Sequence, residues 1–120
     1  MISNLITLKS EDTVEYALKL MNQKKINGAP VADDAGKLVG MIVKADIYRF
    51  LMEEGHYDTC PVDWVMTKKV VVASPNDDLV EVAKKLREHN IIAIPVVEED
   101  NTLKGIVAME DIVDYFLREN

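Results

Sequence analysis

The sequence predicts an α+β fold built from two copies of one unit, each with the element order β-α-β-β-α. The first observation behind this prediction is an internal repeat, because residues 5–55 align with residues 70–120 without a gap. The second is where the identical residues fall. Ten of the fifty-one aligned pairs are identical, and they include Pro30/Pro95, Val31/Val96, Gly40/Gly105 and Asp46/Asp111. Proline fixes the backbone angle φ, and glycine allows conformations and close approaches that other residues cannot adopt, so these matches indicate a repeated structure rather than a similar composition.

The third observation is an apolar helix face that both copies keep. A short first strand, Met1–Leu8 in copy one, precedes each of these helices. Asp12 is expected to cap the helix start, and Glu15 completes the spacing of a capping box. The apolar residues then recur at positions i, i+3, i+4 and i+7, which lie on one side of a helix. They are Val14, Ala17, Leu18 and Met21 in copy one, and Leu79, Val82, Ala83 and Leu86 in copy two.

A β-hairpin and a final helix complete each copy. The expected hairpin strands are Ile26–Val31 with Leu38–Val43, and Ile91–Val96 with Leu103–Ala108. Gly36 and Asn101 occupy the turn positions where a positive φ is expected. Each proline lacks a backbone N–H and is therefore expected at the start of a strand or on a sheet edge. The expected final helices are Ala45–Glu54 and Glu110–Arg118.

Length and composition fit one compact domain, or two small halves that share a core. The 120 residues divide into a first repeat at 1–55, a linker at 56–69 and a second repeat at 70–120. No apolar run reaches the roughly 18–20 residues of a membrane span. The single cysteine, Cys60, excludes an internal disulfide and suggests a reducing, cytoplasmic location. The net charge is −7, with −1 in residues 1–55 and −6 in residues 56–120, so direct nucleic-acid binding is not expected.

No residue pattern predicts catalysis. The chain has no glycine-rich phosphate loop, no G-x-S-x-G motif and no two-histidine metal motif. His56, Asp58 and Cys60 are close in sequence, but a structural zinc site usually needs four ligands. A surface loop is the simpler interpretation of this segment. We therefore expect no catalytic residue and no metal site, and we expect that the chain is not itself an enzyme.

The whole chain resembles a tandem pair of cystathionine-β-synthase-type (CBS) domains, also called a Bateman module. The resemblance rests on Val65-Met66-Thr67, the apolar helix faces, the two Pro-Val pairs, and the spacings Gly40…Asp46 and Gly105…Asp111. It implies two repeats packed with pseudo-two-fold symmetry. It also implies a regulatory module that senses an adenosine-type ligand in the cleft between the repeats. AMP, ADP, ATP, a dinucleotide or S-adenosylmethionine would each fit that class.

The resemblance also places two candidate ligand sites. In related modules the segment reads Gly-apolar-x-Ser/Thr-x-x-Asp; the hydroxyl and the helix-start amides hold phosphate or ribose, and the aspartate binds the ribose hydroxyls. The expected site residues are Gly28, Ala29, Pro30, Val43, Lys44 and Asp46 in the first repeat, and Ala93, Ile94, Pro95, Ala108, Met109 and Asp111 in the second. This sequence departs from the family pattern, because Val43 and Ala108 stand at the hydroxyl position. Asp46 and Asp111 also have an alternative role, since an acidic residue stabilises a helix N-terminus without any ligand.

The two candidate sites are expected to differ. Lys44 adds a positive charge to the first site, whereas Glu110 would repel a phosphate from the second. The first site is therefore the better predicted nucleotide site, and the second suits an uncharged or cationic adenosine compound. Both final helices carry more apolar residues than one buried face requires. The surplus fits either a helix buried between the two repeats or a stripe that faces a second subunit, and the second interpretation predicts a homodimer. An attached effector domain or a partner protein would respond to the ligand; the alternative is a ligand-free dimerisation or interaction module.

Overall fold

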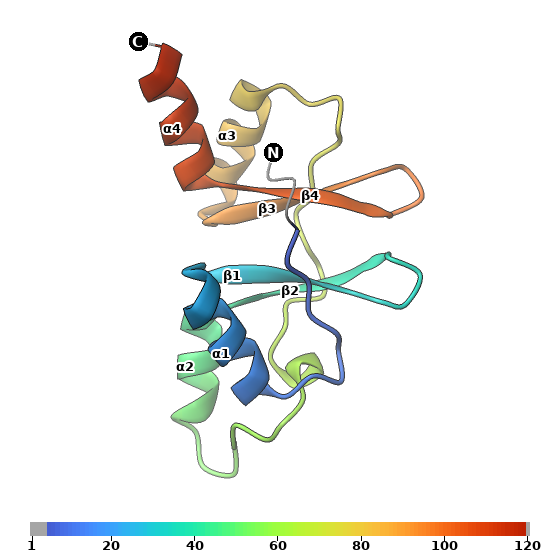
Figure 1. Cartoon of the computed structure of the whole chain (residues 1–120), viewed down its shortest axis with the longest axis vertical. Coiled ribbons are helices and arrows are strands. Elements are labelled where there is room, and N and C mark those ends of the chain that lie inside the picture. The colour runs from blue at the N-terminus through green and yellow to red at the C-terminus, as the bar shows by residue number, and fades with distance from the viewer. Residues whose placement is uncertain (1–4, 120) are drawn as a thin grey trace. The chain divides into compact units, whose positions relative to one another are not determined.

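The computed structural model describes residues 5–119 of the chain, and these form two compact units (Figure 1). One unit is Ile6–Val70, and the other consists of residues 71–119 together with Leu5. The first unit contains α1 (Val14–Lys24), β1 (Gly28–Ala32), β2 (Leu38–Val43), α2 (Lys44–Leu51) and the 3-10 helix η1 (Val62–Trp64). The second contains α3 (Leu79–His89), β3 (Ala93–Val97), β4 (Leu103–Ala108) and α4 (Met109–Glu119). The α+β class and the two repeats are therefore confirmed.

Both units carry the same antiparallel hairpin. Gly28 pairs with Val43 in β1–β2, and Ala93 pairs with Ala108 in β3–β4. The register shifts by one residue at the equivalent place in each hairpin, between Val31 and Ala32 and between Val96 and Val97. Positive φ angles occur at Gly36 (80°) and Asn101 (73°), as the sequence predicts. Strands β2 and β4 have the expected limits, whereas β1 and β3 begin two residues later and end one residue later than expected.

The expected first strand is reduced to a single bridge in the described part of the chain. Leu8 pairs in parallel with Val31, its N–H donating to the Pro30 carbonyl at 3.0 Å. Ala73 repeats this bridge with Val96 in the second unit. The carbonyl of each proline thus joins the sheet although the proline has no N–H to donate. Residues 1–4 of the expected strand lie outside the described residues.

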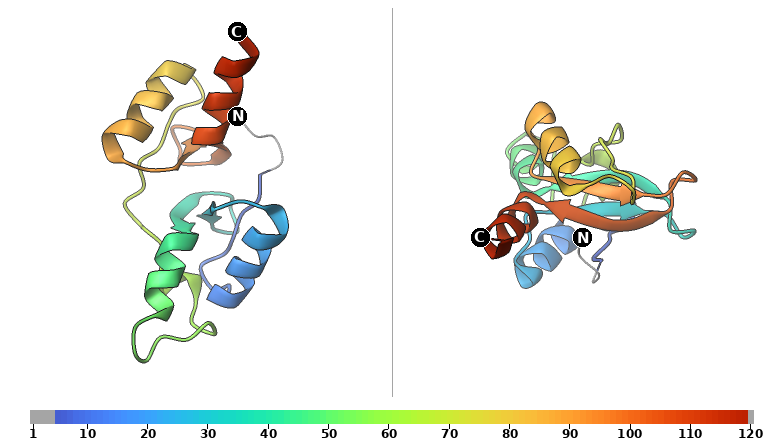
Figure 2. Two further views of the ribbon diagram at one scale, coloured as in Figure 1. Left: turned by 90° about the vertical axis from the view of Figure 1, so that its left-hand side faces the viewer. Right: turned by 90° about the horizontal axis from the view of Figure 1, so that it is seen from above.

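The two helices of each unit lie side by side against the core face of its hairpin (Figures 1 and 2). The first core contains Leu8, Val14, Ala17, Met21, Ala29, Val31, Ile42, Ile47 and Val62, and the second contains Ala73, Val82, Leu86, Ile94, Val96, Val107 and Ile112. The predicted helix faces are confirmed, because three of the four residues named on α1 are fully buried and Val82 and Leu86 are buried on α3. Leu18, Leu79 and Ala83 pack at the edges of these cores.

The expected helix start was wrong by one residue. Thr13, not Asp12, caps α1 and accepts the Tyr16 N–H at 3.0 Å, while Asp78 caps α3 and accepts the Glu81 N–H at 2.8 Å. Asp12 instead accepts the Lys9 N–H at 2.8 Å. The identity between the two copies at Asp12 and Asp77 therefore marks a turn that leads into the helix. The final helices also differ from their expected limits, since α2 ends at Leu51 and α4 begins at Met109.

The segment 56–69 packs within the first unit. Val62 is fully buried in the core, and the carbonyls of Cys60 and Asp58 accept the first two N–H groups of α1 at 2.9 and 2.8 Å. Thr67 then forms two backbone hydrogen bonds with Met41 on β2. The segment at Met66 and Thr67 can come this close to β2 only because position 40 is a glycine. A Cβ at Gly40 would lie 2.7 Å from the Met66 sulfur.

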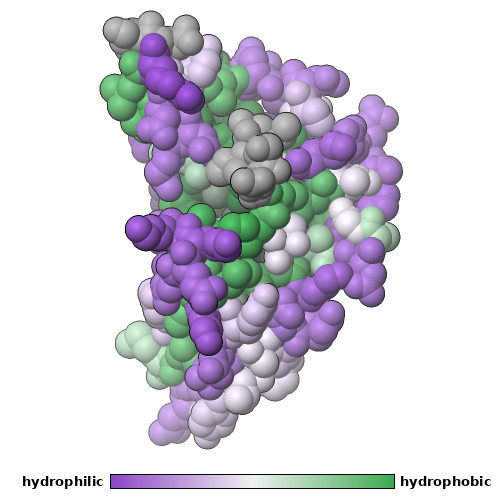
Figure 3. All heavy atoms as spheres, viewed as in Figure 1, coloured by the Kyte–Doolittle hydropathy of each residue, from purple (hydrophilic) through white to green (hydrophobic). Residues whose placement is uncertain are grey.

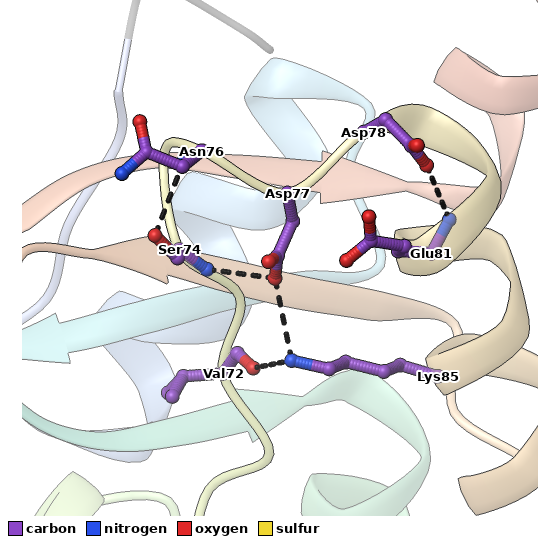
Figure 4. A network of polar contacts seen from close by, with 7 residues as sticks. All are labelled: Val72, Ser74, Asn76, Asp77, Asp78, Glu81 and Lys85. Carbon is purple, nitrogen blue, oxygen red and sulfur yellow. Dashed lines mark hydrogen bonds and ion pairs between the residues drawn. The ribbon is translucent and has the colours of Figure 1, made fainter.

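The turn before α3 is held by a small polar network (Figure 4). Asp77 accepts the Ser74 N–H at 3.0 Å and faces the Lys85 ammonium at 3.3 Å. Lys85 also donates to the Val72 carbonyl at 3.0 Å, which ties the chain entering the unit to α3. The hydrogen bond from Ser74, followed by contact with Lys85, holds the pKa of Asp77 below its ordinary value.

We predict that Asp77→Asn makes the stability of the chain less dependent on pH. The folded pKa of Asp77 lies below its unfolded value of about 3.9, so its stabilising effect exists at neutral pH and disappears as pH falls through the folded pKa. Urea unfolding should show Asp77→Asn less stable than wild type at pH 7, with the difference shrinking in acid below about pH 4. Glu99→Gln at an exposed turn is the control. A difference that stayed constant down to about pH 3 would contradict this assignment.

Candidate ligand sites at the two strand–helix junctions

Each hairpin places the predicted site residues on two opposite faces. Ala29 and Ile94 face the cores of their own units, so only their backbone is available to a ligand. The neighbouring residues point the other way, because successive strand side chains alternate. Gly28, Pro30, Met41 and Val43 share this second face in the first unit, and Ala93, Pro95, Ile106 and Ala108 share it in the second.

In the strand pair next to each helix start, the two opposite side chains have complementary sizes. A Cβ at Gly28 would lie 2.9 Å from a Val43 methyl, so the valine fills the space that glycine leaves. The second unit has two small residues, Ala93 and Ala108, at the same pair. The methyl group of Val43 thus occupies the position where related modules carry a hydroxyl.

The same backbone bond closes both junctions. The N–H of Lys44 donates to the Asn27 carbonyl at 2.8 Å, and that of Met109 donates to the Ile92 carbonyl at 3.0 Å. Val43 is both the last residue of β2 and the N-cap residue of α2. The next N–H groups of each helix have no acceptor four residues earlier, so they present positive partial charge at the junction.

The two candidate aspartates have different partners. Asp46 forms an ion pair with Arg49, one helical turn further on; its side chain is 28% exposed and that of Arg49 is 71% exposed. Asp111 instead accepts the N–H of Ala108 at 2.8 Å and so caps α4. The residue equivalent to Arg49 is Asp114, which cannot form such a pair. The alternative role of an N-terminal helix stabiliser is therefore fulfilled by Asp111.

An open hollow adjoins the first junction. Its volume is about 520 Å³, and it is lined by Asp46, Arg49, Phe50, Glu53, His56, Trp64 and Val65. Asp46 is the one predicted site residue among them. The His56 ring stacks on Phe50 with the centroids 4.0 Å apart, and its Nδ1 lies 2.9 Å from the Phe50 carbonyl oxygen. The loop at His56 is therefore held against the end of α2 by the ring stacking and by the contact with the Phe50 carbonyl.

Sequence reasoning missed two features of the first junction. Arg49 was not named, although its spacing of three residues from Asp46 is the spacing of a helical ion pair. Met41 was also not named, because its place beside Pro30 depends on the hairpin register. Within residues 5–119 no group of three or more potential metal ligands comes together. No helix in that range is long and apolar enough to cross a membrane.

Comparison with known proteins identifies the family. The family model "CBS domain" matches residues 1–53 and again residues 62–118. The chain belongs to the CBS domain family. Its two matches correspond to the two repeats, so the chain is a CBS pair.

Solved CBS pairs share this fold closely. The CBS domain pair of protein MJ0100, in complex with 5′-methylthioadenosine and S-adenosyl-L-methionine, is 31% identical with a TM-score of 0.90, covering 100% of this chain and 94% of that chain. CBSX2 in complex with AMP is 29% identical with a TM-score of 0.87, covering 97% and 90%. Inosine-5′-monophosphate dehydrogenase of Aquifex aeolicus is 33% identical over 114 residues, which are 94% of this chain but 23% of that enzyme. The CBS pair thus corresponds to less than a quarter of this enzyme.

We predict that the two equivalent aspartates contribute differently to stability without ligand. Asp111→Ala removes the hydrogen bond that the Asp111 carboxylate accepts from the N–H of Ala108, directly before α4, and should cost about 0.5–1.5 kcal/mol of unfolding free energy. Asp46→Ala removes an ion pair with a mostly exposed arginine and should cost about 0–1 kcal/mol. Urea unfolding of the two variants at neutral pH provides the measurement. An equal or larger loss in Asp46→Ala would show that the contacts of the two junctions are assigned the wrong way round.

Proposed function

We propose that this CBS pair is a regulatory module that binds an adenosine-type ligand at its strand–helix junctions. The observation that supports this most strongly is the duplicated junction itself. Each one combines small residues on a strand, a helix N-terminus and a carboxylate three residues after the end of the strand. A carboxylate can accept hydrogen bonds from two ribose hydroxyls, and helix-start N–H groups favour anions.

The ligand class is supported by the similar CBS pairs. One was solved with 5′-methylthioadenosine and S-adenosyl-L-methionine, and another with AMP. All three compounds share an adenosine moiety and differ in charge at the 5′ position. We therefore infer adenosine recognition at the strand pair and the aspartate, with the 5′ substituent directed to the helix start.

Charge should separate the two junctions. Lys44 and Arg49 lie on the first two turns of α2, so the first junction suits a nucleotide with a phosphate group. Glu110 and Asp114 occupy the corresponding turns of α4, so the second junction suits an uncharged or cationic adenosine compound. Neither junction carries the hydroxyl of the family pattern, since Val43 and Ala108 take its place.

The regulated activity would belong to an attached domain or a partner protein. Inosine-5′-monophosphate dehydrogenase of Aquifex aeolicus matches this chain over only 23% of its length, so its activity resides in a protein with much additional sequence. A ligand shifts a conformational equilibrium only if it binds one state better than the other. The proposed role of this chain is to provide that difference in affinity, and not to catalyse a reaction.

We also propose that the module forms a homodimer through its final helices. Tyr48 and Met52 on or next to α2 are 49% and 84% exposed, and Val113 and Leu117 on α4 are 48% and 68% exposed. Hydrophobic surface is visible over α4 in Figure 3. Exposed apolar rows of this kind suit a protein interface.

A ligand-free interaction module is the second candidate function. Both junctions lack the hydroxyl, and Asp111 already accepts a hydrogen bond from Ala108, the last residue of β4. These two observations favour a structural role for the second junction in particular. The dimer interface would then be the main function of the chain.

We predict that AMP stabilises the chain through Asp46 and not through Asp111. At a concentration one hundred times its dissociation constant, AMP should add about 2.7 kcal/mol of unfolding free energy. Asp46→Ala should abolish this gain, and Asp111→Ala should retain it, each measured against its own ligand-free baseline. Val43→Thr keeps the side-chain shape and restores a hydroxyl, so it should tighten AMP binding by about tenfold, close to 1.4 kcal/mol.

Titration calorimetry and thermal unfolding with AMP, 5′-methylthioadenosine and S-adenosylmethionine provide the measurements. Loss of the AMP effect in Asp111→Ala alone would reverse the ranking of the junctions. Binding of none of the three compounds would overturn the ligand proposal and favour the interaction module.

A further inference from the structure

Asn27 and Gly28, at the start of β1, form the one Asn-Gly pair in the sequence, and the sequence has no Asp-Gly pair. Asparagine before glycine is chemically labile, because glycine has no Cβ and its backbone nitrogen can approach the asparagine side chain closely. The remaining glycines follow Ala35, Val39, Glu54 and Lys104. The chain therefore contains a single peptide bond of this kind, and it lies at the first strand–helix junction.

The structure leaves both reacting groups accessible. Asn27 is exposed and lies where the chain bends into β1. Gly28 and Val43 are the first pair of the hairpin, and the bond from the Lys44 N–H to the Asn27 carbonyl lies just outside this pair. In an antiparallel ladder this placement makes Gly28 and Val43 a non-hydrogen-bonded pair, so the Gly28 N–H donates no bond to β2. The hairpin therefore does not tie up the backbone nitrogen that acts as the nucleophile.

Packing favours the glycine at this position. A Cβ at Gly28 would lie 2.9 Å from a Val43 methyl, so a larger residue would have to displace the valine or the strand. In the second unit, Ile92 and Ala93 occupy the equivalent positions of the repeat. An isoleucine side chain has no amide group to be attacked, so only the first junction carries the labile pair.

We propose that Asn27 is a site of spontaneous deamidation, which makes the first strand–helix junction sensitive to the age of the protein. The Gly28 nitrogen attacks the side-chain amide carbon of Asn27 and a C–N bond forms. The amide nitrogen leaves as ammonia and takes the Gly28 proton with it. Water then opens the resulting succinimide ring at either carbonyl carbon, which gives aspartate or isoaspartate. Overall, one water is consumed and an uncharged amide becomes a carboxylate and an ammonium ion.

The two products affect the junction differently. Aspartate keeps the main chain as it is and adds a negative charge. In isoaspartate the main chain runs through the former side chain and gains one carbon atom. The carbonyl that accepts the Lys44 N–H then becomes a carboxylate beside the main chain, so this bond and the Gly28–Val43 pair cannot both keep their places. Isoaspartate should therefore loosen the start of α2 from β1, a change that needs no ligand and goes beyond the proposed function.

Peptide mapping by mass spectrometry, during incubation of the full chain at mildly alkaline pH, measures the reaction. Conversion should be at least about tenfold faster at Asn27 than at the exposed Asn76 and Asn101, a barrier difference of about 1.4 kcal/mol. An isoaspartate-specific methyltransferase distinguishes the two products. Equal conversion at the three asparagines, or no conversion at Asn27, would overturn the proposal.

Two variants separate the role of the asparagine from that of the glycine. Asn27→Gln keeps an amide but requires a larger ring, so conversion at this position should be at least about tenfold slower than in wild type. Gly28→Ala/Val43→Ala reproduces the pair of alanines that the second unit has at this place, and puts a Cβ beside the nucleophile. This double variant should also slow conversion at Asn27, and circular dichroism reports whether it is folded. Unchanged conversion in either folded variant would overturn the proposed reaction.

Hydrogen exchange tests the effect on the junction. The Lys44 and Met109 amides are equivalent, since they donate to the carbonyls of Asn27 and Ile92 at 2.8 and 3.0 Å. In chain enriched in isoaspartate, protection of the Lys44 amide should fall at least about tenfold while that of Met109 stays the same. Unchanged protection at Lys44 would overturn the loosening of α2, and an equal fall at Met109 would show that the damage is not local to the first junction.

Discussion

The antiparallel register of the two hairpins fixes the position of every candidate ligand residue. Because Gly28 is opposite Val43 and Ala93 is opposite Ala108, the end of one strand and the start of a helix meet beside a small residue in each unit. The bond from the Lys44 N–H to the Asn27 carbonyl, and its equivalent at Met109, then closes the junction. A slip of one residue would move each of these side chains to the core face, so the register is set by the core as much as by the strands.

The same scaffold supports two junctions with different electrostatics. Asp46 pairs with an arginine on its own helix, whereas Asp111 caps its helix through the Ala108 N–H. Arg49 against Asp114 changes the partner of the aspartate. Together with Lys44 against Met109 and Ala45 against Glu110, it also changes the charge of the helix surface. The different ligand preferences of the two junctions are thus proposed to depend on these positions.

The repeat and the buried faces were predictable from sequence, because period and alternation are local properties of the chain. The helix starts were less predictable from sequence, since Asp12 and Thr13 are both good N-cap residues. Only the fold shows that the Thr13 side chain accepts the Tyr16 N–H. The ends of α1 and α3 could not be recognised from a glycine, the usual residue at positive φ after a helix. Lys25 and Asn90 take this place, with φ angles of 57° and 53°. At the sites, Ala29 and Ile94 could not be assigned to a face before the register was known, and the stacking of His56 on Phe50 depends on the path of the loop.

Backbone amide spectra of the chain during titration with AMP would test the central claim most directly. If the ligand binds at the first strand–helix junction, the largest shift changes should occur at Gly28, Val43 and Asp46, where the strand pair meets α2. Changes confined to the hollow lined by His56 and Trp64, or no saturable change at all, would contradict the account.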